Sequence, residues 1–486
     1  MSFLQVSGTK IVDEQGEEVV LKGAGLGGWM MMENFISGYP GCEYQIRDAL
    51  AEVIGESKAE FFFDKYLEHF FTEADAKFFH SLGLNCIRIA VNYRHFEDDA
   101  NPRTLKANAF THLDRVISIC AQYSIYTVID MHSAPGGQSG GWHCDAGGHL
   151  AYFWRHKDFQ DRLVWLWTII ADRYKSNKWI AGYNVINEPS DPSGWGRTDV
   201  GGKDGKRQLR LVEVYDRLVE AVRSVDEKHI IFLDGNTFAT DFTQFPDDVA
   251  DGRWSNAAFA IHDYSIFGFP NPPATYVGSE EQKERVVKTY RRKREWMDER
   301  GLCVWNGEWG PVYARKDYDG DDWEEVNEVR LKVVRDQLEV YRKDRLSWSI
   351  WLYKDIGFQG MVHVSQETAY IKLFKTFLTR KHKLAADAWG KDDTHVKHAY
   401  QPIIDLIRSE VSSDPQKLKL YPPIWTLEER VTRISRTILF AEFMVKEWAD
   451  HFKGMEEEQL EELARSFRFE NCVEREGLNK VLLEYA

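Results

Sequence analysis

Eight short apolar runs alternate with longer amphipathic segments, and this alternation restricts the fold more than any other feature of the chain. The runs cover residues 19–26, 85–91, 126–131, 180–187, 229–234, 259–264, 302–307 and 347–353. The segments between them show helical spacing of apolar residues, as in 59–80, 157–175, 206–224 and 280–299. Alternating strands and helices predict a parallel sheet, and eight such units close a (β/α)8 barrel. We therefore predict an α/β fold of the TIM-barrel type.

An open doubly wound sheet is the alternative fold for the same alternation. Such a sheet usually carries a glycine-rich phosphate-binding loop between its first strand and a helix. Here the glycine-rich stretch GAGLGGW at 23–29 is followed by MMMENF, which is not such a helix start. The barrel is therefore favoured.

Two further segments flank the predicted barrel. Before it, apolar and polar residues alternate around Gly8 and Gly16, which predicts a β-hairpin that closes the bottom of the barrel. After residue 380 the chain becomes polar, breaks at YPPIW (421–425), and continues as a highly charged, helix-like stretch. We predict a barrel domain with its hairpin at 1–380 and a helical C-terminal extension at 381–486, whose role is packing or contact within a homo-oligomer.

Composition limits the classes of partner. A net charge of −15 argues against nucleic acid and anionic membranes, because phosphate binding needs basic patches. No run approaches the length of a membrane-spanning helix, and the first residues lack the pattern of a secretory signal. The six cysteines are scattered without a CxxC pair, and the apolar surroundings of Cys86, Cys120 and Cys303 are typical of reduced core residues. We expect a cytoplasmic protein, and secretion of a processed form stays open.

Polar or aromatic side chains stand at the ends of seven of the eight runs, where a purely structural strand would end in apolar residues. The carboxyl ends of the strands form the active site of a barrel enzyme. This pattern predicts a functional site there. Its candidate residues are Glu33, Arg88, His132, Asn187, Glu188, His262, Tyr264, Glu308 and Trp351.

Two carboxylates dominate this set, Glu188 after the fourth run and Glu308 after the seventh. Hydrolysis of a glycosidic bond needs one carboxylic acid to protonate the leaving oxygen, and one carboxylate to attack the sugar or activate water. His262 is a candidate partner of the acid, whereas Arg88 and Tyr264 are expected to donate to Glu308 and keep it ionised. The pair predicts glycoside hydrolysis.

Further side chains could contact a sugar. Asn187 can hydrogen-bond a hydroxyl next to the reacting carbon, and Trp351 could form the floor under the ring. The 17 tryptophans are a high number, and four others could be sugar platforms or core residues. These are Trp142, Trp195, Trp254 and Trp309.

Three motifs together resemble those of glycoside hydrolase family 5: NEP at 187–189, HDY at 262–264 and GEWG at 307–310. The resemblance extends over residues 5–360. It implies a retaining enzyme in which Glu188 is the acid/base and Glu308 the nucleophile. The family pattern then assigns a supporting shell to Arg88, His132, Asn187, His262, Tyr264 and Trp351.

Two longer motifs are similar to those of the fungal exo-β-1,3-glucanase and β-glucosidase branch of this family. They are LKGAGLGGWMMMEN at 21–34 and DMHSAPGGQSG at 130–140. In that branch the glutamate matching Glu33 binds the non-reducing-end sugar, which implies exo action. The chain departs from the branch at Tyr353, where tryptophan is common, and in its C-terminal extension.

We therefore expect an exo-acting, retaining β-glucosidase or exo-β-glucanase that removes a terminal β-glucosyl unit from a β-glucoside or oligosaccharide. The alternatives within the family are a rutinosidase-like β-diglycosidase and an intracellular steryl or lipid β-glucosidase. The non-enzyme alternative is an inactive barrel that only binds carbohydrate. We predict no cofactor and no metal, because the WHCD stretch at 142–145 and His132 lack the HxH or HExxH spacing of a zinc site.

Overall fold

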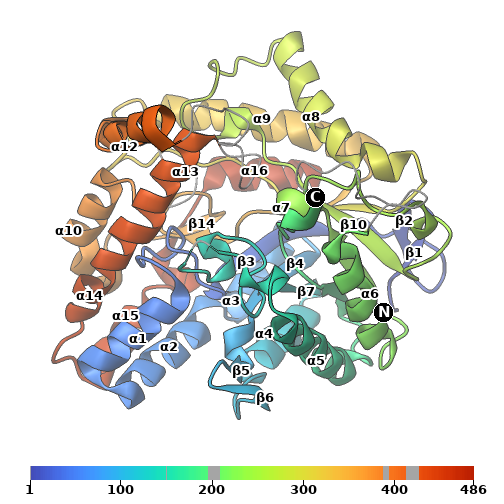
Figure 1. The fold of residues 1–486 in the computed structure, drawn as a ribbon, viewed down its shortest axis with the longest axis horizontal. Helices are drawn as coiled ribbons and strands as arrows, with labels where there is room; N and C mark the ends of the chain where they lie inside the picture. The colour runs from blue at the N-terminus through green and yellow to red at the C-terminus, as the bar shows by residue number, and fades with distance from the viewer. Residues whose placement is uncertain (1, 149, 195–207, 387–392, 412–425) are drawn as a thin grey trace.

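Eight parallel strands form a closed barrel in the computed structural model, which describes residues 2–148, 150–194, 208–386, 393–411 and 426–486 (Figure 1). The TIM barrel predicted from the sequence is confirmed, and every barrel strand overlaps one of the eight predicted runs. These strands are β3 (Lys22–Met30), β4 (Cys86–Asn92), β7 (Tyr126–Ser133), β8 (Ile180–Asn184), β9 (Ile230–Asp234), β10 (Ala257–His262), β11 (Val304–Glu308) and β12 (Ser347–Ile350).

Helices surround the barrel in the alternating order that the sequence predicts. They are α1 (Glu43–Ile54), α2 (Glu56–Phe70), α3 (Glu73–Ser81), α4 (Thr111–Gln122), α5 (Lys157–Tyr174), α6 (Arg210–Arg223), α7 (Asn236–Ala239), α8 (Glu280–Asp298), α9 (Trp323–Asp344) and α10 (Ala369–Lys383). Helix α5 shows why these segments fold against the sheet, because its buried residues Leu163, Trp167 and Ile170 recur at helical spacing. The segment 59–80 forms two helices, since Thr72 caps the start of α3 together with Asp75.

The N-terminal hairpin closes the bottom of the barrel, as predicted. Strands β1 (Gln5–Ser7) and β2 (Lys10–Val12) pair in antiparallel fashion. Leu4 and Ile11 belong to a buried apolar cluster that includes residues from the N-terminal ends of the strands, among them Cys86, Tyr126 and Ile230. The opposite end of the barrel, where the strands terminate, is therefore left for the site.

The segment after residue 383 is mostly helical but also contributes a strand. Its described elements are α11 (Thr394–Lys397), α12 (Gln401–Leu406), a π-helix η7 (Ile407–Val411), α13 (Leu427–Arg433), a π-helix η9 (Ile434–Phe440), α14 (Ala441–Asp450), α15 (Glu457–Arg465), a 3-10 helix η10 (Phe469–Asn471), β15 (Cys472–Glu474) and α16 (Glu476–Tyr485). Strand β15 pairs with β14 (Val362–Val364), which itself pairs with β13 (Lys354–Asp355). A separate small hairpin, β5 (Glu97–Asp98) and β6 (Asn101–Leu105), follows β4.

Helices of the extension pack against helices outside the barrel: α14 against α1, α15 against α2, and α16 against α9 (Figure 1). The ring of Trp448 in α14 lies 4.8 Å from that of Tyr39, and Phe467, which follows α15, lies 4.8 Å from Tyr66 in α2. The predicted division at 380/381 stays a prediction, and that position falls inside α10. None of the helices in the described part of the chain is long and apolar enough to cross a membrane.

Candidate active site

A cavity of about 270 Å³ opens at the carboxyl ends of the barrel strands. Seven of the nine residues predicted for the site line it, and the other two, Arg88 and Asn187, are fully buried against the residues of its wall. The lining residues are Glu33, Phe35, His132, Gly141, Trp142, His143, Glu188, Phe238, Thr240, His262, Tyr264, Lys293, Glu308, Trp351 and Arg433.

Glu308, the last residue of β11, is held by two donors. Arg88 Nη1 donates to its Oε1 at 2.7 Å, and the Tyr264 hydroxyl donates to its Oε2 at 2.8 Å. A charge-assisted hydrogen bond from a guanidinium stabilises the ionised form of a carboxyl group. The arrangement suits a carboxylate that attacks as a nucleophile.

Arg88 is fixed by acceptors on neighbouring strands. Its Nη2 donates to Asn187 Oδ1 at 2.6 Å and to Asn184 Oδ1 at 3.0 Å, and it lies 3.1 Å from Asp130 Oδ1. Burial disfavours its charge, but the carboxylates of Asp130 and Glu308 outweigh this and raise the pKa of Arg88. The fork-shaped guanidinium therefore stays charged and aims one nitrogen at Glu308.

Glu188 sits at a turn rather than on the strand. The sequence predicted a strand over 180–187, whereas β8 ends at Asn184. Glu188 has a φ of 44°, in the left-handed region that costs a residue with a side chain about 1–2 kcal/mol. Its backbone N–H donates to Asp234 Oδ2 at 2.9 Å, which helps to hold the turn. The turn aims the carboxyl group into the cavity.

The Glu188 carboxyl group has histidines on both oxygens. His262 Nδ1 lies 2.7 Å from Oε1, and His143 Nε2 lies 3.5 Å from Oε2. Burial raises the pKa of Glu188, and His143 and Arg88 oppose that rise. A carboxyl group with a raised pKa keeps its proton closer to neutral pH, as a general acid requires.

The two glutamates are close enough for double displacement. One oxygen of each lies within 4.8 Å of the other and of a ring nitrogen of His262. Retaining glycosidases hold their carboxyl groups about 5–5.5 Å apart, whereas inverting enzymes need about 6.5–9.5 Å to admit a water molecule. The separation fits a retaining site. Among the described residues, this trio is also the one group with the spacing of metal ligands.

His132 and Trp351 form a stacked pair on the cavity wall, with ring centroids 5.1 Å apart and an angle of 7°. His132 Nδ1 lies 2.7 Å from Asp130 Oδ2, and Asn187 Nδ2 donates to His132 Nε2 at 3.3 Å. Burial lowers the pKa of His132 to about 3, so the ring is neutral in this network. Trp351 therefore lines the cavity with its orientation fixed by a neutral histidine.

The glycines of the first barrel strand serve the position of Trp351. A Cβ atom at Gly25 would lie 2.5 Å from the indole ring, and one at Gly27 would lie 2.7 Å from it. Both distances are shorter than any real Cβ contact, so only glycine at positions 25 and 27 leaves room for the ring. The GAGLGGW stretch thus provides space for an aromatic side chain.

Glu33 is buried beside the cavity and contacts an indole. Trp142 Nε1 donates to its Oε2 at 3.1 Å, and His132 Nε2 lies 3.8 Å from its Oε1. Burial, followed by repulsion from Glu308 and Glu188, raises the pKa of Glu33 well above its usual range. Glu33 and Trp142 together form a polar wall next to the two catalytic candidates.

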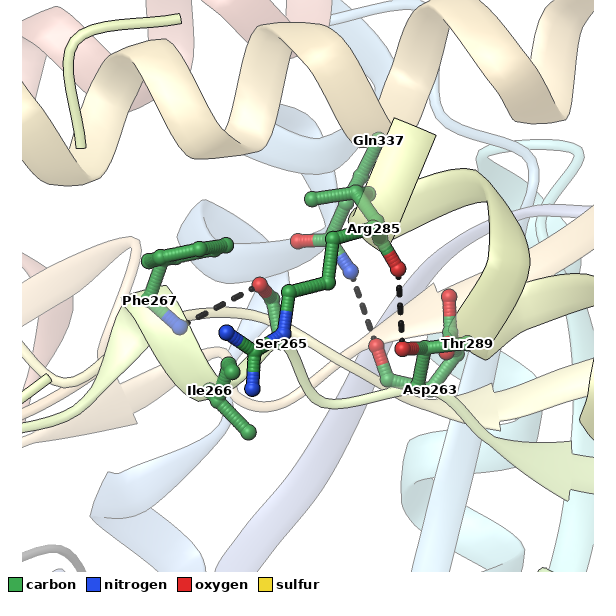
Figure 2. A pocket seen from close by; sticks show the side chains of 8 residues that line it. Asp263, Ser265, Ile266, Phe267, Arg285, Thr289 and Gln337 are labelled. Carbon is green, nitrogen blue, oxygen red and sulfur yellow. Dashed lines mark hydrogen bonds between the residues drawn. The ribbon is translucent and has the colours of Figure 1, made fainter. Parts of the chain in front are cut away.

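Within the segment 262–264, Asp263 is held by hydrogen bonds from residues of α8 and α9. Asp263 Oδ1 accepts from Lys293 Nζ at 2.8 Å, and its Oδ2 accepts from the Tyr341 hydroxyl at 2.7 Å. Figure 2 shows Gln337 donating to the backbone carbonyl of Asp263, at 2.8 Å. These contacts to α8 and α9 fix the strand end that presents His262 and Tyr264.

The candidate sugar platforms fall into two groups. Trp142 lines the cavity, whereas Trp254 donates to Asp216 and packs on Phe259, and Trp309 is fully buried. Trp195 lies outside the described residues. Several lining residues were not predicted at all, including Phe238, Thr240 and, from the extension, Arg433.

Comparison with known proteins agrees with this geometry. Residues 53–357 match the model of the cellulase family, glycosyl hydrolase family 5. A protein named beta-xylosidase from Phanerodontia chrysosporium is 62% identical over 487 residues, covering 100% of this chain and 98% of its own. A probable glucan 1,3-beta-glucosidase A from Aspergillus clavatus is 27% identical over 275 residues, covering 55% of this chain and 60% of its own.

A solved structure shares the fold. The crystal structure of an endogalactoceramidase aligns with a TM-score of 0.50 and 16% identity, covering 72% of this chain and 74% of its own. The match of the family model to more than half of the chain, together with the full-length relative, settles the classification. This protein is a glycosidase that belongs to glycosyl hydrolase family 5.

Proposed function

We propose that this protein is an exo-acting, retaining β-glycosidase that removes one terminal β-xylosyl unit from its substrate. The observation that carries the proposal is the pairing of Glu188 and Glu308, whose carboxylate oxygens lie within 4.8 Å, in a chain 62% identical to a beta-xylosidase over its full length. The type of sugar rests on that relative, and the reaction type rests on the site.

In the proposed mechanism Glu308 attacks the anomeric carbon while Glu188 protonates the glycosidic oxygen of the leaving group. A covalent glycosyl-enzyme forms and the leaving group departs. Glu188, now ionised, removes a proton from a water molecule that attacks the same carbon and displaces Glu308. The sugar is released with its β configuration retained, and Glu188 recovers its proton.

Supporting roles follow from the contacts already described. Arg88 and Tyr264 stabilise the Glu308 carboxylate before attack and when it leaves the sugar. Asn187 and His132 form a linked pair next to the reacting centre. Glu33, which accepts a hydrogen bond from Trp142, is the proposed ligand of the terminal sugar. The wall that Glu33 and Trp142 form at the cavity supports exo action.

A terminal β-glucosyl unit is the second candidate substrate. It is favoured by the LGGW…E motif at 26–33, which places Glu33 in the cavity, and by the similarity to a glucan 1,3-beta-glucosidase. Xylose differs from glucose only by the absence of the hydroxymethyl group on C5. Because the two sugars are otherwise alike, both can bind in the same subsite. Preference is then decided by space and hydrogen bonding at that carbon.

The test is hydrolysis of 4-nitrophenyl β-xyloside and β-glucoside, with the anomer of the first product followed by NMR. We expect kcat/KM for the xyloside to exceed that for the glucoside at least tenfold, and β-xylose to appear before mutarotation. A reversed preference would support the glucosidase. First release of the α-anomer would reject the mechanism, and release of oligosaccharides from a xylan chain would reject exo action.

A further inference from the structure

Arg433 reaches the active-site cavity from the C-terminal extension. It is the last residue of α13 and lines the cavity together with Trp142 and Glu188. Its guanidinium carbon lies 5.9 Å from the ring centroid of Trp142, whose Nε1 donates to Glu33. A segment outside the matched family region of residues 53–357 therefore contributes to the wall of the site.

The extension is held in a way that fixes this position. In η9, directly after Arg433, Thr437 and Ile438 border a small cavity whose other wall includes Gly140 and Trp142. Further along, Trp448 packs on Tyr39 at 4.8 Å. The helix that carries Arg433 is thus packed against the loop that carries Trp142.

A short series of contacts leads from Arg433 to the proposed acid. Arg433 lies over Trp142, the Trp142 ring is 5.8 Å from that of His143, and His143 Nε2 is 3.5 Å from Glu188 Oε2. Burial, together with repulsion from Arg436, lowers the pKa of Arg433 to about 10, and the charges of Glu429 and Glu188 oppose this, so the side chain is a cation at neutral pH. Arg433 and Glu188 therefore line the same cavity, close enough for their charges to interact.

We propose that Arg433 is a substrate-binding residue that donates hydrogen bonds to hydroxyl oxygens of a sugar leaving group. The inference rests on the proposed glycosidase function and adds the chemical class of the leaving group. A guanidinium offers several N–H donors in a fixed plane, which matches the neighbouring hydroxyl oxygens of a sugar. A 4-nitrophenyl leaving group has no hydroxyl oxygens on neighbouring carbons, so Arg433 selects for glycosides whose second unit is a sugar.

The experiment compares two substrates with the same terminal sugar, xylobiose and 4-nitrophenyl β-xyloside. We expect Arg433→Ala to lower kcat/KM for xylobiose about 10- to 100-fold, and at least tenfold more than for the aryl xyloside. Arg433→Lys should recover part of the loss. The control is Arg430→Ala, one turn earlier on α13 and absent from the cavity wall, which should leave both values unchanged.

Equal losses on both substrates, or no loss on either, would overturn the proposal. If the wild type cleaves the aryl xyloside but not xylobiose, the Kd of xylobiose is measured by calorimetry instead, and an unchanged Kd in Arg433→Ala overturns it. If the wild type cleaves no glycoside, the proposed function fails by itself. The same calorimetric comparison then still decides whether Arg433 binds a disaccharide, with weaker binding in Arg433→Ala as the supporting result.

Discussion

Arg88 Nη1 lies 2.7 Å from Glu308 Oε1, and this pair joins the second strand of the barrel to the seventh. Arg88 is fully buried, so its charge depends on the acceptors around it. The same guanidinium binds Asn187, one residue before Glu188. One side chain therefore aligns the two halves of the site.

Replacing Arg88 by lysine tests whether the several hydrogen bonds of its guanidinium are needed for activity. Arg88→Lys keeps the charge but cannot reach Glu308, Asn187 and Asn184 at once. We expect kcat/KM to fall about 100-fold or more, since charge-assisted hydrogen bonds contribute about 1.5–3 kcal/mol each. Arg162→Lys, at the buried ion pair with Glu97, is the matched control and should leave kcat/KM within a few-fold of wild type. Equal effects of the two substitutions on kcat/KM would contradict the assignment.

Removal of the proposed nucleophile, Glu308, should abolish nearly all activity. Glu308→Ala is expected to lower turnover by several orders of magnitude with an unchanged circular dichroism spectrum, since no covalent intermediate can form. Azide can then attack in place of the carboxylate, and NMR should detect an α-glycosyl azide. A β-glycosyl azide would instead assign the nucleophile elsewhere.

The pH profile reports the acid. Glu188 must be protonated for the first step, and burial raises its pKa, so kcat/KM should fall as pH rises through a pKa above the usual carboxyl range. In Glu188→Gln this alkaline limb should disappear. A 2,4-dinitrophenyl glycoside needs no protonation of its leaving group, so it should lose less activity than a methyl glycoside. An unchanged alkaline limb would exclude Glu188 as the acid.

Because Trp351 packs on Gly27, we expect a substitution of this glycine to lower activity, although glycine has no side chain that could contact the substrate. In Gly27→Ala the new Cβ would lie 2.7 Å from the indole, so the ring must move. We expect kcat/KM to drop about tenfold and stability to fall by about 1–3 kcal/mol. Gly148→Ala, where a Cβ meets nothing within 4 Å, is the control. Unchanged kinetics in Gly27→Ala would mean that the orientation of Trp351 is not needed.

The stability of the fold should depend on the buried side chain of Lys354. Lys354 Nζ contacts Asp75 Oδ1 at 2.6 Å and the carbonyls of Phe70 and Phe467 at 2.7 and 2.8 Å. Lys354→Met leaves a buried carboxylate without its cation, which costs about 3–5 kcal/mol. Lys65→Met, at an ion pair on the surface, should cost at most about 1 kcal/mol. Urea denaturation would compare the two, and equal midpoints would contradict the prediction.

The barrel could be predicted because its signals are local. Strands buried on both faces read as apolar runs, and their order along the chain implies the parallel sheet. The positions of Glu188 and Glu308 followed from the same reasoning, since every strand ends at one rim. The break between α2 and α3 also has a local signal, Thr72 three residues before Asp75, although the segment was predicted as one helix.

The parts that could not be predicted depend on distant contacts. Arg433 belongs to a charged helical stretch whose sequence resembles any solvated helix, and only packing against the Trp142 loop brings it to the cavity. Strand β15 is three residues long and has no alternation to reveal it. His143 lies in the WHCD stretch, where spacing alone gave no role beside Glu188.

The bond from Lys22 Nζ to the carbonyl of Tyr485 spans 463 positions in sequence. Lys22 begins the first barrel strand, so this contact can form only after almost the whole chain has been synthesised. Long-range closures of this kind slow folding and leave partly formed sheets exposed to aggregation. Docking of α16 on the first barrel strand is therefore a late step of folding, and substitutions in α16 can change the yield of folded protein as well as its structure.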